Sequence, residues 1–219
     1  SWNTTAWKNE KVHTQLVIST KKNITNVTLS VSNLINARGS KISNKNIAVG
    51  FVQYVMTDEF KNGCGHRKSV DFDSSWVADI INTDLKKIDI NKNTTQPIWL
   101  TIEVPENTPA GKYSGVVTVK VDKTYNLPFT IIVLDRILPS PKDWSFRLDY
   151  WQHPAAVARV HNVKLWSDEH FSLMRKYYTM LANAGQKIIT AGIVDEPWGH
   201  QTYDDYPSLI QWTKKTDGS

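Results

Sequence analysis

The stretch VPENTPAGKYSGVVTVKVD, which runs from Val104 to Asp122, decides the fold class of the first part of the chain. Pro105 and Pro109 end one apolar strand and stiffen the turn that follows it. Gly111 provides backbone freedom that a Cβ would remove, and Tyr113 then opens a second strand. This pattern predicts a long hairpin of the immunoglobulin-like type, and it indicates architecture rather than chemistry.

Alternation of apolar and polar residues extends outward from this stretch, from Lys11 to about Leu134. A period of two in β-branched residues is typical of strands, and connections rich in Asn, Gly, Lys and Pro are typical of turns. The runs that show the alternation are KVHTQLVIST at 11–20, VTLSV at 27–31, IAVGFVQYVM at 47–56, IWLTIEV at 98–104, VTVKV at 117–121 and FTIIVL at 129–134. Roughly seven strands in this length predict a mainly β fold, with an immunoglobulin-like β-sandwich over residues 1–137.

A short linker is expected after the sandwich. Residues 138–143 contain Pro139 and Pro141 on either side of a serine, with charged residues nearby, which is typical of a stiff connection. Beyond it, the run SFRLDYWQHP at 145–154 predicts a strand that leads into an aromatic and polar loop.

The pattern then changes to that of a helix. Ser167 is a good helix N-cap, apolar residues follow at spacings of three and four, and Gly185 stands where a left-handed residue ends a helix. The nearly continuous apolar run KIITAGIV at 187–194 is typical of a parallel strand buried on both faces. We therefore expect one βαβ unit between Phe146 and Val194.

Composition excludes several classes of protein. The 219 residues carry a net charge of +5, but the basic residues are scattered in pairs instead of forming the concentrated face that nucleic-acid binding requires. No apolar run approaches the ~20 residues of a membrane span. Cys64 is the one cysteine, so no intrachain disulfide can form.

Neither a metal nor a cofactor is expected. Cys64 and His66 lie close together in a loop-like stretch, but two ligands cannot complete a zinc site, which needs three or four. Four other histidines are not spaced from possible partner ligands as in a metal site, and we expect them to be solvated or hydrogen-bonded. They are His153, His161, His170 and His200.

The two predicted parallel strands of the second half end in similar residues, aromatic and polar. In α/β barrels the active site is built from loops at the carboxyl ends of the strands. Flat aromatic faces suit the apolar face of a sugar ring, while carboxylates and amides bind its hydroxyls. We therefore expect a glycan or oligosaccharide partner, bound by Trp151, Gln152, His153, Asp195, Trp198 and Tyr203. Three further tryptophans, Trp144, Trp166 and Trp212, are expected to pack against the protein.

Asp195 and Glu196 form an adjacent acidic pair at the end of the second of these strands. Two neighbouring carboxylates are typical of glycoside hydrolysis, so both are candidates for catalysis. The alternatives are contact with substrate, support of substrate-binding residues, a loop salt bridge, or a helix cap. The residues alone do not decide between these roles.

Four stretches resemble bacterial proteins, of the Bacteroides type, that are related to glycoside hydrolase family 123. They are KVHTQLVIST, PIWLTIEVPENTPAGKYSGVVTVKV, DYWQHPAAVARVHNVKLWSDEHFSLMRKYYTMLANAGQKIIT and DEPWGHQTYDDYPSLIQWTKK. The resemblance implies that a β-sandwich precedes a (β/α)8 barrel, and that the complete protein is an exo-acting β-N-acetylgalactosaminidase or a similar β-N-acetylhexosaminidase. It also implies a retaining, substrate-assisted reaction, in which an Asp orients the 2-acetamido group, the oxygen of that group attacks C1, and the adjacent Glu is the acid/base.

The same resemblance implies that the family's Asp-Glu pair lies near the fourth barrel strand, beyond Asp195 and Glu196, so the catalytic residues of this chain are unknown. Residues 144–219 are also far fewer than the ~250 of a complete barrel. We therefore expect them to be the first βαβ part of a truncated (β/α)8 barrel, and we expect the chain to be an inactive fragment of a hydrolase.

Two other functions stay open, a carbohydrate-binding or cell-surface adhesion module without catalysis and a scaffold without a ligand. Self-association is expected through the incomplete barrel edge, since an exposed apolar sheet edge favours pairing. The resemblance, together with a first residue that is not Met, implies a secreted, periplasmic or outer-membrane-associated protein.

Overall fold

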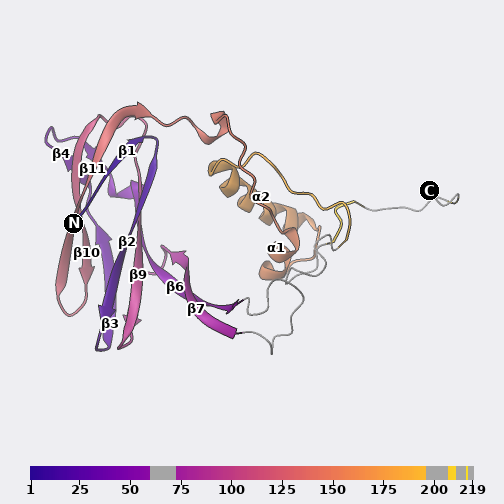
Figure 1. Cartoon of the computed structure of the whole chain (residues 1–219), viewed down its shortest axis with the longest axis horizontal. Helices are drawn as coiled ribbons and strands as arrows, with labels where there is room; N and C mark the ends of the chain where they lie inside the picture. The colour runs from indigo at the N-terminus through magenta and orange to yellow at the C-terminus, as the bar shows by residue number, and fades with distance from the viewer. Residues whose placement is uncertain (60–72, 196–206, 211–215, 217–219) are drawn as a thin grey trace. The chain divides into compact units, whose positions relative to one another are not determined.

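The computed structural model describes residues 1–59, 73–195, 207–210 and 216 (Figure 1). The chain divides into two compact units, of which the first contains Ser1–Asp58 and Ser74–Leu138 and the second contains the chain from Pro139 onward. The first unit is built from strands, and the two α-helices belong to the second. The prediction of a mainly β protein is confirmed.

The strands of the first unit form two sheets. A 7-stranded sheet has the order β1-β11-β10-β3-β8, with β4 paired to β10 and β5 paired to β4, and a 4-stranded sheet has the order β2-β9-β6-β7. The strands are β1 (Trp2–Lys8), β2 (Lys11–Thr20), β3 (Ile24–Val31), β4 (Leu34–Asn36), β5 (Lys41–Ile42), β6 (Ile47–Glu59), β7 (Asp73–Asn82), β8 (Lys87–Ile90), β9 (Thr94–Glu103), β10 (Gly111–Lys120) and β11 (Thr124–Ile137). A 3-10 turn over Asn44–Asn46 precedes β6.

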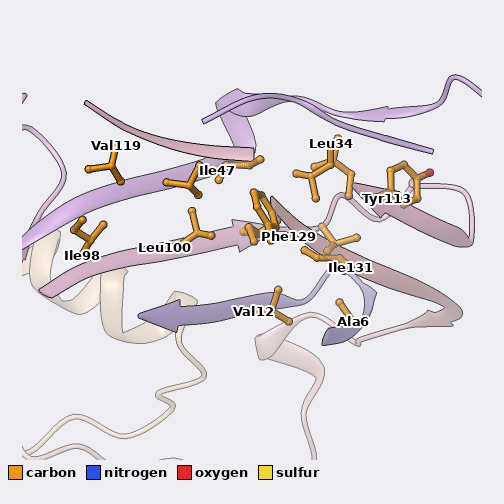
Figure 2. Close-up of a cluster of buried hydrophobic side chains, with 14 of the residues drawn as sticks. Ala6, Val12, Leu34, Ile47, Ile98, Leu100, Tyr113, Val119, Phe129 and Ile131 are labelled. Atoms are coloured by element: carbon orange, nitrogen blue, oxygen red, sulfur yellow. The ribbon is translucent and has the colours of Figure 1, made fainter. Parts of the chain in front are cut away.

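One hydrophobic core joins the two sheets (Figure 2). Alternate residues of each strand point into it, which is why the period of two in the sequence is so regular. In β9, Ile98, Leu100 and Ile102 are each no more than 1% exposed, and they meet Phe129 and Ile131 of β11 within the same cluster. Each fully buried side chain of this size contributes about 1.5–3 kcal/mol, so the alternation supplies most of the driving force for this unit.

The predicted hairpin at Val104–Asp122 is wrong, because β9 and β10 belong to different sheets. The segment between them is a corner through which the chain crosses from one sheet to the other. Its ends are fixed by the Val104 N–H, which donates to the Glu10 carbonyl at 2.9 Å, and by the buried Tyr113, whose hydroxyl donates to the Pro109 carbonyl at 2.9 Å. A tyrosine that bonds back to the preceding turn is a device that sandwich folds use at such corners.

Gly50 of β6 lies against the backbone of another segment. A Cβ built on Gly50 would stand 2.7 Å from the Asn82 carbonyl oxygen and 3.1 Å from the Thr83 Cα. Both neighbours are backbone atoms at the end of β7, so they have little freedom to move aside. The sequence requires glycine here because of this close approach.

The second unit contains two helices, α1 (Pro154–His161) and α2 (Asp168–Asn183), which lie next to each other (Figure 1). The predicted helix that begins after Ser167 is confirmed as α2, and Gly185 follows it with a φ of +104°. A 3-10 turn, Pro141–Asp143, precedes both helices. Helix α1 was not predicted.

The two predicted parallel strands of the second unit are not formed as strands. Between residues 145 and 195 the only parallel pairing is an isolated bridge between Leu148 and Gln186. The physical reason is that a parallel ladder needs neighbours on its edges and cover on both faces, and two segments beside two helices do not provide them. Among the described residues, no helix is long and apolar enough to cross a membrane.

Candidate functional site

The loop before α1 carries three of the predicted sugar-binding residues and is organised by the start of that helix. Pro154 occupies the first helical turn, where its missing N–H costs nothing. The His153 side chain is the N-cap, and its Nδ1 accepts a hydrogen bond from the Ala156 N–H at 3.3 Å. Acceptance at Nδ1 places the proton of the neutral ring on Nε2.

Two glutamines hold the chain together where the predicted strands would have paired. The buried Gln152 donates from Nε2 to the Tyr150 carbonyl, and its Oε1 accepts from the Thr190 N–H at 2.7 Å. Gln186 accepts from the Tyr150 N–H at 2.6 Å through Oε1 and donates to the Ile188 carbonyl at 2.5 Å through Nε2. These side-chain bonds replace ladder hydrogen bonds and keep residues 148–152 beside residues 186–190.

His170 fixes α2 against the start of α1. Its side chain is 0% exposed, its Nδ1 accepts from the Trp166 N–H at 3.0 Å, and its Nε2–H donates to the Pro154 carbonyl at 2.9 Å. The Trp166 ring lies 5.3 Å from the His170 ring. This histidine is therefore a hydrogen-bonded structural residue, as the sequence predicted.

We expect replacement of His170 by leucine to lower the free energy of unfolding of the second unit by about 2–4 kcal/mol, because the Pro154 carbonyl and the Trp166 N–H lose their hydrogen-bond partners. Hydrogen exchange of the amides of α2, measured by mass spectrometry, reports the change locally. His161→Leu is the matched control, because His161 is exposed and, among the described residues, its ring bonds the Tyr177 hydroxyl alone, at 2.8 Å. Equal effects of the two substitutions would contradict the role given to His170.

A cavity of about 140 Å³ brings together the three predicted residues of the first loop. Trp151, Gln152 and His153 line it together with Tyr177 and Tyr178 of α2. Trp151 is 70% exposed, so its ring is accessible from outside. Neither tyrosine was among the predicted site residues, and the helical spacing of Tyr178 indicated only a packing face.

Asp195 lies apart from this cavity and closes a loop. Its Oδ1 accepts a hydrogen bond from the Ser208 N–H at 2.6 Å, and the Leu209 N–H donates to the Gly192 carbonyl at 2.8 Å. Both bonds join the same two segments of chain, so the Asp195 carboxylate acts here as a loop tether. Glu196, Trp198 and Tyr203, the other predicted residues of this stretch, lie outside the described residues.

Trp144 packs against the protein as expected. Its ring is stacked on that of Phe146, with centroids 5.4 Å apart, and its Nε1–H donates to the Pro139 carbonyl at 2.8 Å. The ring also covers Gly185, where an added Cβ would stand 2.5 Å from the Trp144 Cζ3. Trp212 lies outside the described residues.

The described residues contain no group of three His, Cys, Asp or Glu side chains that could hold a metal ion. The chemistry available in this region therefore consists of an exposed indole, two tyrosines and polar groups that already carry structural hydrogen bonds. That arrangement suits contact with a polyhydroxylated ligand, for which aromatic faces and hydrogen-bonding groups are needed together.

Models of two domains from known proteins match this chain. The chain carries the domains of a glycoside hydrolase. The family model described as the glycoside hydrolase 123 N-terminal domain matches residues 1–121, and the model described as the glycoside hydrolase 123 catalytic domain matches residues 151–219. The chain belongs to glycoside hydrolase family 123, as its resemblance implied.

A solved structure of a family 123 glycoside hydrolase from Clostridium perfringens, studied for glycolipid glycan hydrolysis, is similar over the whole chain. The TM-score is 0.88 at 29% sequence identity, and the match covers 100% of this chain and 37% of that one. The chain therefore spans little more than a third of the length of this relative. A search of the curated proteins found no match.

Other solved structures share much less with this chain. The periplasmic chaperone SfaE matches with a TM-score of 0.32 at 7% identity, over 68% of this chain and 61% of that chain. A PapD-like domain of human CEP192 matches with a TM-score of 0.32 at 9% identity, over 62% and 82%. These likenesses are too weak to support an argument about this protein.

Proposed function

We propose that this chain is the N-terminal part of a β-N-acetylhexosaminidase whose catalytic pair lies beyond Ser219, and that the chain alone is catalytically silent. The observation that carries the proposal is the match of the family's catalytic domain to residues 151–219, in a chain that spans 37% of a similar family 123 hydrolase. The hydrogen bond that Asp195 accepts from the Ser208 N–H is consistent with a structural role for this carboxylate.

In the proposed architecture, the first unit is an immunoglobulin-like sandwich and residues 144–219 are the opening βα part of a (β/α)8 barrel. The parallel bridge between Leu148 and Gln186 has the direction that adjacent barrel strands require. Trp151, Gln152, His153, Asp195, Trp198 and Tyr203 would line or support the sugar-binding rim. We place the protein outside the cytoplasm, in the periplasm or at the cell surface of a bacterium, on the basis of the family resemblance alone.

The complete reaction would be retaining and assisted by the substrate. The acetamido oxygen of a bound N-acetylhexosamine attacks C1, the glycosidic bond breaks as the leaving oxygen takes a proton from a carboxylic acid, and water then opens the cyclic intermediate. This route needs no protein nucleophile, in contrast to the usual pair of carboxylates. It also needs no metal or cofactor.

The decisive experiment compares the 219-residue chain with the product of the whole reading frame that encodes it, on 4-nitrophenyl N-acetyl-β-D-galactosaminide and its gluco-configured isomer. We expect turnover only from the whole product. Turnover by the 219-residue chain that is lost in Glu196→Gln would show that the acidic pair is catalytic and overturn the assignment. Failure of the whole product on both substrates would exclude an N-acetylhexosaminidase.

A carbohydrate-binding module is the second candidate function, favoured by the 70% exposure of Trp151 beside the 140 Å³ cavity. Retention of the chain on a glycan affinity gel, with loss of retention in Trp151→Ala, would support this function even in the absence of catalysis. Trp76→Ala removes an indole that is 64% exposed in the first unit, and it is the matched control.

We also propose that the second unit self-associates through the edge of its incomplete barrel, where apolar side chains are exposed. Phe171 and Ile189, which are 49% and 68% exposed, line a groove of about 650 Å³ between α2 and residues 186–190. A patch of this kind favours pairing with an apolar partner surface. Light scattering across a concentration series should show a mass above that of the monomer, and a monomeric mass throughout would exclude this surface as a dimer contact.

A further inference from the structure

Trp166 has a backbone conformation that a bulky residue rarely adopts. Its φ is +62°, in the left-handed region, which for a bulky L-residue is an outlier. The residue is the third of the turn Lys164–Ser167, which is closed by a hydrogen bond of 3.1 Å from the Ser167 N–H to the Lys164 carbonyl. A turn with a positive φ at this position usually has glycine or asparagine there. The turn alone therefore gives no reason for tryptophan, and the reason lies in the contacts that this residue makes.

A first set of contacts connects Trp166 to the start of α1. The Trp166 N–H donates to Nδ1 of the buried His170 at 3.0 Å, and the two rings lie 5.3 Å apart. The Nε2–H of the same histidine donates to the Pro154 carbonyl at 2.9 Å. Pro154 directly follows Trp151–His153, the first stretch expected to bind the sugar, which we call the first rim segment. Trp166 is thereby connected to the first rim segment through one buried side chain.

Trp166 also packs against the loop that Asp195 closes. We call residues 192–195 and 207–209 of this loop the second rim segment, and they are joined by the bond from the Leu209 N–H to the Gly192 carbonyl and by that from Ser208 to Asp195. Trp166 lines a space of about 10 Å³, whose other lining residues are His153, Pro154, Ala155, Gly192, Pro207 and Leu209. A space of this size is at the lower limit for one water molecule, so these residues are closely packed. One half-buried tryptophan therefore contacts both rim segments.

We propose that Trp166 is a positioning residue, which sets the spacing between the two rim segments and so places the sugar-binding residues. This inference rests on the function proposed above, since it takes the two segments to bind the sugar. Trp166 acts through His170 and through packing, not through contact with the sugar. A strained backbone persists only where the surrounding contacts determine it, and the bond to His170 and the packing against both segments do so here.

The size and rigidity of the indole explain why tryptophan occupies this position. An indole has few rotatable bonds and a large flat surface, so it fixes a separation that a flexible side chain would not. Glycine would suit the φ of +62° but would leave the space between the segments unfilled. Loss of the ring should therefore disturb both segments together, although the turn itself would be relieved of strain. Because the proposed catalytic pair lies beyond Ser219, the effect should fall on substrate binding and not on the chemical step.

Hydrogen exchange in the 219-residue chain tests the spacing without any turnover. Two backbone amides report on the two segments: that of Ala156, which donates to the His153 ring, and that of Leu209, which donates to the Gly192 carbonyl. Trp166→Gly should accelerate the exchange of both amides at least tenfold, as followed by nuclear magnetic resonance. Trp166→Phe, which keeps an aromatic ring beside His170, should restore both rates to within threefold. Acceleration of only one amide, or of neither, would overturn the proposal.

Trp144→Ala is the matched control. It removes an indole from the same unit, but the Trp144 ring packs against Phe146 and Gly185 and does not line the 10 Å³ space. It should accelerate exchange near Gly185 and leave both reporter amides within threefold of the unsubstituted chain. Equal acceleration of the reporter amides by Trp144→Ala and Trp166→Gly would overturn the proposal, because any loss of packing in the unit would then have the same effect.

Kinetics of the product of the whole reading frame, on 4-nitrophenyl N-acetyl-β-D-galactosaminide, test the consequence for the substrate. Trp166→Gly should raise KM at least tenfold and leave kcat within threefold, because displaced binding residues weaken the ground state and the transition state alike. Trp166→Phe should restore KM to within threefold, and Trp144→Ala should not raise it. A fall in kcat at constant KM would overturn the positioning role. No turnover by the unsubstituted product would instead contradict the proposed function, and the amide exchange rates would still decide whether Trp166 sets the spacing.

Discussion

Replacement of Gly50 by alanine is expected to lower the free energy of unfolding of the first unit by about 3 kcal/mol, the upper end of the usual cost of overpacking. The new methyl group would stand 2.7 Å from the Asn82 carbonyl oxygen. The obstacle is backbone in a neighbouring strand, so relief requires β6 and β7 to move apart, not a side chain to rotate. Urea denaturation followed by far-ultraviolet circular dichroism measures the loss.

Gly115→Ala is the matched control for this prediction. Gly115 also lies in a strand of the first unit, but the nearest atoms to an added Cβ are the Leu34 Cγ and the Ser32 Oγ, both at 3.2 Å. These two are side-chain atoms, the Asn33 carbonyl oxygen follows at 3.3 Å, and each needs to yield by only a few tenths of an ångström. We expect a cost of about 1 kcal/mol or less. A cost as large as that of Gly50→Ala would show that the strand contact is not the cause.

Gly185→Ala is expected to destabilise the end of α2 and the segment after it by about 3 kcal/mol, the sum of backbone strain and a side-chain clash. The φ of Gly185 is +104°, which an L-residue rarely adopts, and an added Cβ would stand 2.5 Å from the Trp144 ring. The ring is held by its stacking on Phe146 and by its hydrogen bond to Pro139. Hydrogen exchange of residues 168–190, measured by mass spectrometry, should accelerate.

Gly39→Ala separates the cost of backbone strain from the cost of the side-chain clash. Gly39 has a φ of +82°, but no atom lies within 4 Å of an added Cβ, so its substitution introduces strain without a clash. We expect about 1–2 kcal/mol from this variant. An equal loss of stability in Gly185→Ala and Gly39→Ala would show that the Trp144 ring moves aside freely. The Trp144 ring would then not be held in place as described.

The β character of the first unit could be predicted because core burial imposes a period of two on strands such as β2 and β9. Helix α2 could be predicted because Ser167 and Gly185 mark its ends with local chemistry. Strand β1 was missed, since its inward positions are Trp2, Thr4 and Ala6, which carry little β-branched signal. Its parallel pairing with β11 is a long-range contact that no local pattern encodes.

The corner at Val104–Tyr113 and the helix α1 were misread for different reasons. A turn rich in proline looks the same whether the two strands pair or separate into different sheets, and only the sheet order distinguishes them. For α1, proline in the first turn followed by two alanines was a usable signal. It was obscured because the preceding aromatic and polar residues suggested a binding loop.

The contacts of the predicted site residues could not be predicted from the sequence. Trp151, Gln152 and His153 line one cavity. Gln152 and His153 also bond the backbone N–H groups of Thr190 and Ala156, and those bonds can be foreseen only if the positions of Thr190 and Ala156 are known. The same holds for Asp195 and Ser208. A polar residue next to an apolar run is equally suited to ligand binding and to structure, and the choice depends on neighbours that are remote in sequence.

The pairing of the first strand with the last has a consequence for how the protein is made. Lys8 and Asp135 form an ion pair at 2.6 Å although they are 127 residues apart in the sequence. Strand β1 leaves the ribosome before β11 and cannot pair with it until β11 has emerged, which takes on the order of ten seconds at ordinary rates of synthesis. During that interval β1 cannot pair with β11. The pairing that completes the sheet closes a long loop, which is the kind of contact that makes folding slow. Secretion or chaperone binding in that interval would act on a sheet that lacks its outer strand.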